Sequence, residues 1–310
     1  MRKQNIYKKL IVKVRGIIRN ARIPRSFSKK NNNVFSNEKH IIMYILMQKE
    51  RKHYRDMPDF LELLKAEISL VRIPHFTTIN KFALRVKPLW FEQLIAQIVK
   101  AVATEESLIC AIDGTGFSLN SRSKYFETIV GERKEFLQFN ACFEGKLKLI
   151  TAAKIRLKKR NENIDAPKLM RTTANQLKID AFLMDKLYDS EKNHIVAEEC
   201  GARMIAPLRE KTKQYHRIKG IHRKKLFGNF PREIYNKRAS ICENGFSVLK
   251  NKYGEIIYAN KFRTQKIELL GKVLAYNIEK VAKYFILGFY FLQHIDFRKL
   301  YKPLSFFILN

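Results

Sequence analysis

The sequence predicts an α/β fold in which a mixed β-sheet flanked by helices follows a small α-helical domain. Two observations predict this. Residues 39–103 place their apolar side chains at helical spacing, whereas near Leu108 the pattern changes to short buried and alternating runs typical of strands. With 310 residues, of which 46% are hydrophobic, the chain is long enough for one large domain or two ordinary ones.

The net charge is the most unusual feature of the composition. The 61 lysines and arginines exceed the 29 aspartates and glutamates, which gives +32 at pH 7, and the basic residues extend along the whole chain. Because self-repulsion at such a charge opposes compaction, the charge indicates a polyanionic partner, most often nucleic acid. A compositional bias toward lysine, isoleucine and asparagine contributes, but does not by itself raise the charge this far.

Cysteine and histidine usage excludes several kinds of site. The four cysteines lie far apart without a Cys-x-x-Cys pair, so they are expected to be reduced thiols of a cytoplasmic protein. The seven histidines show no metal-ligand spacing. The N-terminus lacks the apolar core of a signal peptide. The apolar run from Tyr284 to Leu292 is too short to span a bilayer, so no membrane partner is expected.

The N-terminal third is predicted to form a basic arm and a helical domain. Residues 1–38 contain no acid before Glu38 and would be either a flexible arm or a short helix with a linker, adding salt-dependent DNA affinity. Residues 39–103 are interpreted as a DNA-binding or dimerisation domain, including a helix over 58–70. Helical bundles without a DNA role have the same pattern, so a helix-turn-helix function stays open.

The order of the later elements predicts an RNase H-like domain over residues 104–280, followed by an apolar tail over 281–310. The first three strands are expected to be antiparallel, because a turn joins the second to the third. The expected elements are strands over 108–113, 136–143 and 147–155, a helix over 167–178, a strand over 181–184, a helix over 190–200, and a strand over 203–206.

The last part of this domain combines a basic segment with a helix. Residues 208–232 are interpreted either as a loop held against phosphates or as a solvated loop. The helix is expected to begin near Ser240, because Ser240 and Glu243 have capping-box spacing. Lys250 follows Glu243 by about two helical turns, so both are expected on one face. Alternatively, Glu243 is only a cap and Lys250 a solvated residue.

Three acids are candidate metal ligands. Asp113 and Asp185 are expected at the ends of apolar strands, where an isolated charge is unfavourable without a cation and where open sheets form ligand sites. Glu243 would approach from the helix packed across them. Carboxylates are the ligands that Mg²⁺ prefers, and two-metal phosphodiester chemistry needs several at one point. The alternatives are a turn at Asp113 and a competing acid, Asp189, that caps the next helix.

Three motifs in order resemble the DDE transposases of bacterial and archaeal insertion sequences. They are DGTGF at Asp113, MDKLYDS around Asp185, and YNKR…E…FSVLK over 235–250. More narrowly, they resemble the group with a Tyr-Arg-Glu-Lys signature around the third acid, whose C-terminal helices are similar to residues 254–280. The resemblance covers residues 105–280.

The resemblance implies a catalytic, metal-binding triad of Asp113, Asp185 and Glu243 that holds two Mg²⁺ or Mn²⁺ ions. The residues implied to hold the transposon end are Tyr235, Arg238 and Lys250. The implied reaction is strand cleavage by water, followed by attack of the freed 3′-OH on target DNA. The implied partner is double-stranded DNA, both element ends and target, bound by a homodimer at the nucleoid in the cytoplasm.

The sequence departs from this family at one position. Arg238 precedes Glu243 by five residues, where the family has four, and one residue turns a helical side chain by about 100°. A helix that begins at Ser240 would leave Arg238 outside it and allow compensation. The short segment between Asp185 and Glu243 predicts no β-rich insertion. Other functions that fit the acids are an RNase H-like nuclease of repair or recombination and a catalytically inactive DNA-binding protein.

Overall fold

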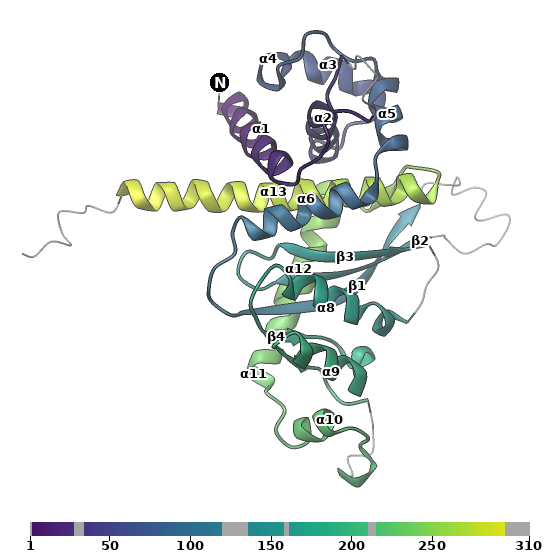
Figure 1. The fold of residues 1–310 in the computed structure, drawn as a ribbon, viewed down its shortest axis with the longest axis vertical. Helices are drawn as coiled ribbons and strands as arrows, with labels where there is room; N and C mark the ends of the chain where they lie inside the picture. Colours follow the sequence, from purple (N-terminus) through teal and green to yellow (C-terminus); the bar gives the residue numbers. More distant parts are fainter. Residues whose placement is uncertain (1, 28–33, 120–135, 158–160, 210–214, 295–310) are drawn as a thin grey trace, which may run out of the picture.

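The computed structural model describes residues 2–27, 34–119, 136–157, 161–209 and 215–294 (Figure 1). The α-helices are α1 Arg2–Asn20, α2 Asn37–Lys49, α3 Met57–Glu62, α4 Lys65–Ile68, α5 Phe76–Arg85, α6 Pro88–Lys100, α8 Ala166–Ala174, α9 Glu191–Glu199, α10 Ile221–Leu226, α11 Arg232–Tyr235, α12 Lys237–Tyr253 and α13 Phe262–His294. The 3-10 helices are η1 Tyr54–Asp56, η2 Glu162–Ile164, η3 Lys186–Tyr188 and η4 Tyr215–Arg217. The strands are β1 Leu108–Leu119, β2 Phe136–Glu144, β3 Ile150–Arg156, β4 Ile179–Leu183, β5 Arg203–Ile205 and β6 Ile256–Ile257.

The sheet has the strand order β3-β2-β1-β4-β5, and β6 pairs with the end of β1. β1, β2 and β3 are antiparallel, whereas β4 and β5 run parallel to β1. Helices α8 and α9 contact one side of this sheet, and α6, α12 and α13 contact the other. The predicted mixed sheet with an antiparallel start is therefore confirmed, in the RNase H-like order.

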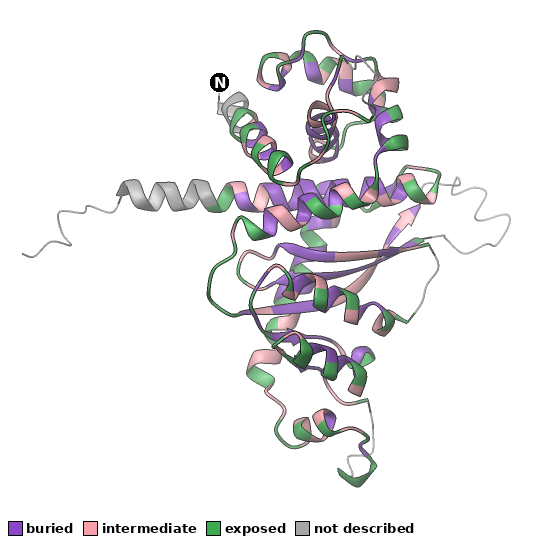
Figure 2. Cartoon of the chain, in the orientation of Figure 1, coloured by how far each residue is buried: buried purple, intermediate pink, exposed green. Residues whose placement is uncertain are grey.

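Both faces of the central strand β1 are buried, which explains its apolar sequence. Ala111 and Phe117 belong to the larger core under α12 and α13, while Cys110 and Ile112 belong to a separate core under α8 and α9. Successive side chains of a strand point to opposite faces, so β1 divides the two cores. Figure 2 shows buried residues along the strands and along the middle of α13.

Helix α13 lies between the N-terminal helices and the sheet (Figure 1). It contacts α1, α2 and α5 on one side and β3 and β6 on the other. Helix α2 is buried all round its central turns, which explains the dense apolar run Ile41–Met47, and Ser36 Oγ caps it by accepting from Lys39 N at 3.3 Å. The expected boundary between residues 280 and 281 falls inside α13.

Several predicted elements differ from the structure. The helix expected over 58–70 is two short helices, α3 and α4, and Ser69 ends α4 in the left-handed region at φ 61°. α1 supports the helical interpretation of the N-terminal arm. Residues 295–310 of the predicted tail lie outside the described residues.

Two errors in the predicted elements affect the site. The first strand does not end at Asp113, because β1 continues to Leu119 along its pairing with β2. The capping box at Ser240 is wrong, because α12 begins at Lys237 and Ser240 Oγ donates back to the carbonyl of Lys237 at 2.9 Å. Arg238 therefore lies inside the helix.

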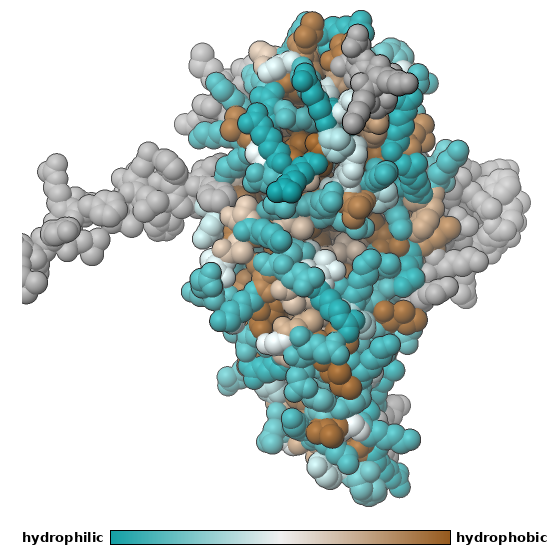
Figure 3. Space-filling view, viewed as in Figure 1, coloured by the Kyte–Doolittle hydropathy of each residue, from teal (hydrophilic) through white to brown (hydrophobic). Residues whose placement is uncertain are grey.

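None of the described helices combines the length and the apolar character that a bilayer crossing requires. The face in Figure 3 is largely hydrophilic, with apolar residues in small separate patches.

Candidate active site

Asp113 lies within β1, opposite Ala141 of β2, and is half-buried. Its Oδ1 accepts from the backbone N–H of Gly114 at 2.9 Å. Burial raises the pKa of the Asp113 carboxyl above its ordinary value, and the charge of Asp185 adds to this effect. The Gly114 N–H and the Arg238 guanidinium act in the opposite direction. Since Asp113 is paired within a strand, the alternative of a turn is excluded.

Asp185 follows β4, the parallel neighbour of β1, by two residues and is half-buried. Its Oδ1 accepts from Leu187 N at 2.7 Å, which caps η3. The structure thus brings the first two predicted acids within electrostatic reach of each other. The alternative role for Asp189 is wrong, because the side chain that caps α9 is Ser190, not Asp189.

Arg238 places a positive charge on this pair. Its Nη1 donates to Asp113 Oδ2 at 2.9 Å, and both side chains are about one-fifth exposed. The Arg238 guanidinium lies 5.9 Å from the centroid of the Tyr235 ring, which packs at 5.1 Å against Phe230. Of the three predicted DNA-binding residues, Arg238 is therefore in contact with Asp113, and Tyr235 is in contact with Arg238.

The two other predicted residues of helix α12, Glu243 and Lys250, make no contact with Asp113 like that of Arg238. The helix packs against the sheet through Gly245 and Phe246, and the Phe246 ring lies edge-on to Phe143 at 4.9 Å. Lys250, half-buried, lies with its Nζ 5.5 Å from the centroid of the Phe117 ring. Glu243 is exposed and makes no hydrogen bond or ion pair to the residues that the structure describes.

The five-residue spacing explains the position of Glu243. Because Arg238 and Glu243 lie on one continuous helix, five residues turn the side chains apart by about 140°. Arg238 reaches Asp113, whereas Glu243 points to solvent. Its assignment as the third acid stays a prediction.

Glu162 is an acid near the pair that the sequence interpretation missed. It is half-buried in η2, between β3 and α8, and its Oε2 accepts from the hydroxyl of Tyr188 at 3.1 Å. Burial is the main cause that raises the pKa of the Glu162 carboxyl, and the charges of Asp113 and Asp185 raise it further. The only sequence signal was an acid at the end of the basic run RLKKRN.

The segment that carries Glu162 is anchored by Asp165. This buried carboxylate accepts from Arg156 Nε at 2.9 Å and from Asn140 Nδ2 at 2.8 Å. Arg156 and Asn140 belong to β3 and β2, so the start of α8 is tied to the sheet.

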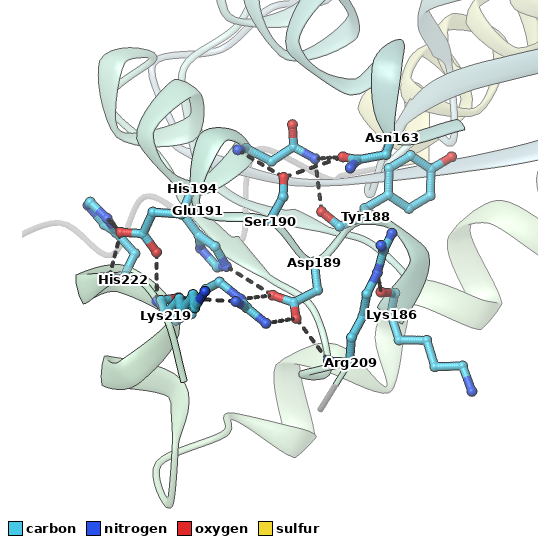
Figure 4. A network of polar contacts seen from close by, with 12 residues as sticks. Asn163, Lys186, Tyr188, Asp189, Ser190, Glu191, His194, Arg209, Lys219 and His222 are labelled. Carbon is cyan, nitrogen blue, oxygen red and sulfur yellow. Dashed lines mark hydrogen bonds and ion pairs between the residues drawn. The ribbon is translucent and has the colours of Figure 1, made fainter. Parts of the chain in front are cut away.

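A second polar network, centred on Asp189, joins Arg209 and α10 to the residues that follow β4 (Figure 4). Asp189, fully buried at its side chain, accepts from Arg223 Nε at 2.8 Å and Nη2 at 2.7 Å. The backbone N–H of Arg209 donates to the same carboxylate at 2.8 Å. His222 lies between Glu191 and Glu198, at 2.7 and 2.9 Å. These contacts dock α10 onto α9 and tie Arg209 to the residues that follow β4.

The donor chemistry of the site suits a divalent cation. Asp113, Asp185 and Glu162 offer hard carboxylate oxygens, which Mg²⁺ and Mn²⁺ prefer. Within the described ranges, no three His, Cys, Asp or Glu side chains are close enough to hold an ion together. In this arrangement Arg238 supplies the positive charge at Asp113.

The mixed sheet and its flanking helices follow the RNase H-like order, with Asp113 and Asp185 brought near each other on neighbouring strands. The sequence pattern of the transposase DDE domain family matches residues 104–278, more than half of the chain, and the chain belongs to this family. The protein is a transposase, and the family is divalent-metal dependent. The predicted resemblance is thereby confirmed.

Comparisons with individual proteins add little to this assignment. No curated protein matches the chain. Among solved structures, it is similar to a piggyBac transposase in a synaptic complex with hairpin DNA. The sequences are 8% identical, 91% of this chain and 75% of the other are covered, and the TM-score is 0.47.

Proposed function

We propose that this transposase cleaves DNA strands at the ends of its element and joins the freed 3′ ends to target DNA, using two Mg²⁺ or Mn²⁺ ions. The supporting observation is the approach of Asp113 in β1 to Asp185 after β4, with Arg238 bound to the first acid. When bound, the ions would activate the attacking oxygen and stabilise the leaving oxygen.

The chain's own residues would have three roles. Asp113 and Asp185 hold the ions, since both carboxylates are accessible and each retains an oxygen without a backbone N–H donor. Glu243 completes the set, which requires its exposed side chain to turn toward Asp113 when metal and DNA bind. A cation bound at Asp113 would compete with the Arg238 guanidinium for the same carboxylate oxygen. Arg238 would then leave Asp113 and bind a DNA phosphate instead.

The proposed partner is double-stranded DNA. Tyr235 and Lys250 lie on the same side of the sheet as Arg238 and would hold the transposon end with it. The charge of +32 would neutralise phosphates over an extended surface, so binding should weaken steeply with salt. We further propose a homodimer, since two ends are joined together, and a cytoplasmic, nucleoid-associated location.

The test is a strand-cleavage and strand-transfer assay with Mg²⁺ on DNA that carries the element's ends. Asp113→Asn and Asp185→Asn should each lower cleavage by about 100-fold or more while DNA binding persists. Asp180→Asn is the control, since Asp180 is an exposed acid of β4 paired with Arg203. Undiminished cleavage by Asp113→Asn would overturn the proposal. Undiminished cleavage by Glu243→Gln would remove only Glu243 from the triad, and cleavage without strand transfer would indicate a nuclease.

A further inference from the structure

Two oxygen acceptors meet over Gly114 on the side of β1 that faces α8. Asn140 is fully buried and pairs with Gly114 across the β1–β2 ladder. Its Nδ2 donates to Asp165 Oδ2 at 2.8 Å, which fixes the orientation of the amide. Its Oδ1 therefore points the other way as an acceptor, and it has no hydrogen-bond partner among the described residues.

Glu162 directs a carboxylate oxygen into the same space. A Cβ atom added to Gly114 would lie 2.4 Å from Glu162 Oε1 and 2.6 Å from Asn140 Oδ1. The other oxygen of Glu162 is held by the Tyr188 hydroxyl at 3.1 Å. The side chains of Tyr188 and Gln138 hydrogen-bond to the Glu162 carboxylate, whereas the neighbouring Asn140 Oδ1 has no partner among the described residues, and an orphaned buried acceptor is unfavourable by roughly 1–3 kcal/mol. A cation beside Glu162, or a proton on it, would satisfy the Asn140 oxygen.

We propose that Glu162 Oε1 and Asn140 Oδ1 form a further divalent-cation subsite of the active centre, on the side of β1 that faces α8. This inference rests on the proposed metal-dependent function. A carboxylate with an amide carbonyl is a ligand pair that Mg²⁺ and Mn²⁺ accept. Side chains alternate along a strand, so Asp113 and the space over Gly114 lie on opposite faces of β1. Glu162 thus reaches the centre from the side of α8, opposite to α12.

The position of the subsite relative to the two aspartates supports the proposal. Glu162 lies within electrostatic reach of both Asp113 and Asp185, whose charges raise the pKa of its carboxyl. Three negative charges around the end of β4 attract a cation more strongly than the two aspartates alone. Asp165 holds Asn140, and Tyr188 holds Glu162, so the subsite is ordered before the cation arrives.

The experiment measures Mn²⁺ binding to the full chain without DNA, by the electron paramagnetic resonance signal of free Mn²⁺. Glu162→Gln should weaken the tightest site by about 10-fold or more, within the range that loss of one supporting group produces. Glu199→Gln, at an exposed acid paired with Arg171, should leave Mn²⁺ affinity unchanged. Thermal unfolding in EDTA should show that both variants fold.

The outcomes separate the subsite from the proposed function. Wild-type affinity in Glu162→Gln, together with a loss in Asp113→Asn, overturns the subsite alone and leaves Glu162 as a protonated structural acid bound to Asn140. A wild-type chain that binds no Mn²⁺ and cleaves no DNA overturns both proposals. Should Glu162→Gln fail to fold, Glu162→Asp replaces it. A shorter carboxylate is expected to weaken Mn²⁺ binding, and unchanged affinity overturns the subsite.

Discussion

The guanidinium of Arg238 lies 2.9 Å from Asp113 Oδ2, although 125 residues separate the two in sequence. Each side chain is about one-fifth exposed, so the pair is partly shielded from solvent. Without a divalent ion, the arginine balances the charge of the first acid. A cation that binds Asp113 must therefore compete with Arg238.

Arg238→Gln should lower the free energy of unfolding by about 1 kcal/mol in EDTA, the scale of a partly exposed pair. In saturating Mg²⁺ the loss should be smaller, because the ion replaces the missing charge. Urea unfolding in both buffers measures this. Arg203→Gln, which breaks the exposed Asp180 pair, should show no Mg²⁺ dependence. Equal losses of Arg238→Gln in both buffers would show that metal does not reach Asp113.

Gly114→Ala should destabilise the chain by about 1–3 kcal/mol, because the new methyl group overlaps Glu162 Oε1 and Asn140 Oδ1. Gly116→Ala is the matched change two residues on, where the methyl would meet the partly exposed ring of Phe136 at 3.1 Å. It should lose less than 1 kcal/mol, since that ring can move. Thermal or urea unfolding compares them. A Gly114→Ala variant as stable as Gly116→Ala contradicts the close packing described over Gly114.

Breaking the Asp189–Arg223 pair should be strongly destabilising. Arg223→Met leaves the fully buried Asp189 carboxylate with a backbone donor and with His194 Nε2 at 4.0 Å, a ring whose pKa burial lowers, but without its permanent positive partner, an effect of about 3–5 kcal/mol. Arg171→Met breaks an ion pair that is about half exposed and should change stability by less than 1 kcal/mol. Urea unfolding measures both, and hydrogen exchange should show α10 opening first. Similar stabilities of the two variants would contradict the structural role of Asp189.

Alanine at two helical glycines should have opposite effects. Gly245 of α12 faces the sheet, and an added methyl would lie 2.4 Å from Phe143 Cε1, so Gly245→Ala should destabilise by about 1–3 kcal/mol. Gly16 of α1 is exposed with nothing within 4 Å, so Gly16→Ala should stabilise by about 0.5–1 kcal/mol through helix propensity. Thermal unfolding compares them. A stabilising Gly245→Ala would mean that α12 packs farther from the sheet.

The docking of α10 should weaken as pH rises. Hydrogen bonds to Glu191 and Glu198 raise the pKa of His222 above its ordinary value. The stabilisation from charged His222 is therefore complete below the unfolded pKa of about 6.5 and is lost as pH rises through the raised value.

Hydrogen exchange of α10 between about pH 5 and 9 should show this trend in the wild type and a flatter one in His222→Gln. His194 stacks on His222 at 6.2 Å, and burial lowers the pKa of His194. It acts in the opposite sense at low pH, and because both proteins retain it, their difference isolates His222. Identical pH profiles would exclude His222 as the docking cation.

Local patterns in the sequence were sufficient to predict the family, most of the order of elements and the approach of Asp113 to Asp185. Apolar periodicity reports which side of an element is buried, so the strands up to β5 and the helices between them could be placed within a few residues, except for the end of β1. The charge of +32 indicated a polyanionic partner before any element was placed. These features depend on residues that are close in sequence, so they can be predicted without knowledge of the fold.

Tertiary contacts decided what the patterns left open. Pairing with β2 extends β1 beyond Asp113, and docking on the sheet starts α12 before Ser240, although a capping box was available. The sequence therefore determined the family and the charge, and it indicated Asp113 and Asp185 as candidate acids. Only the folded chain decided that Glu162 and Asn140 meet over Gly114. The unpaired Asn140 Oδ1 lies on β2 and Glu162 lies in η2, and no local sequence period encodes a contact between these two elements.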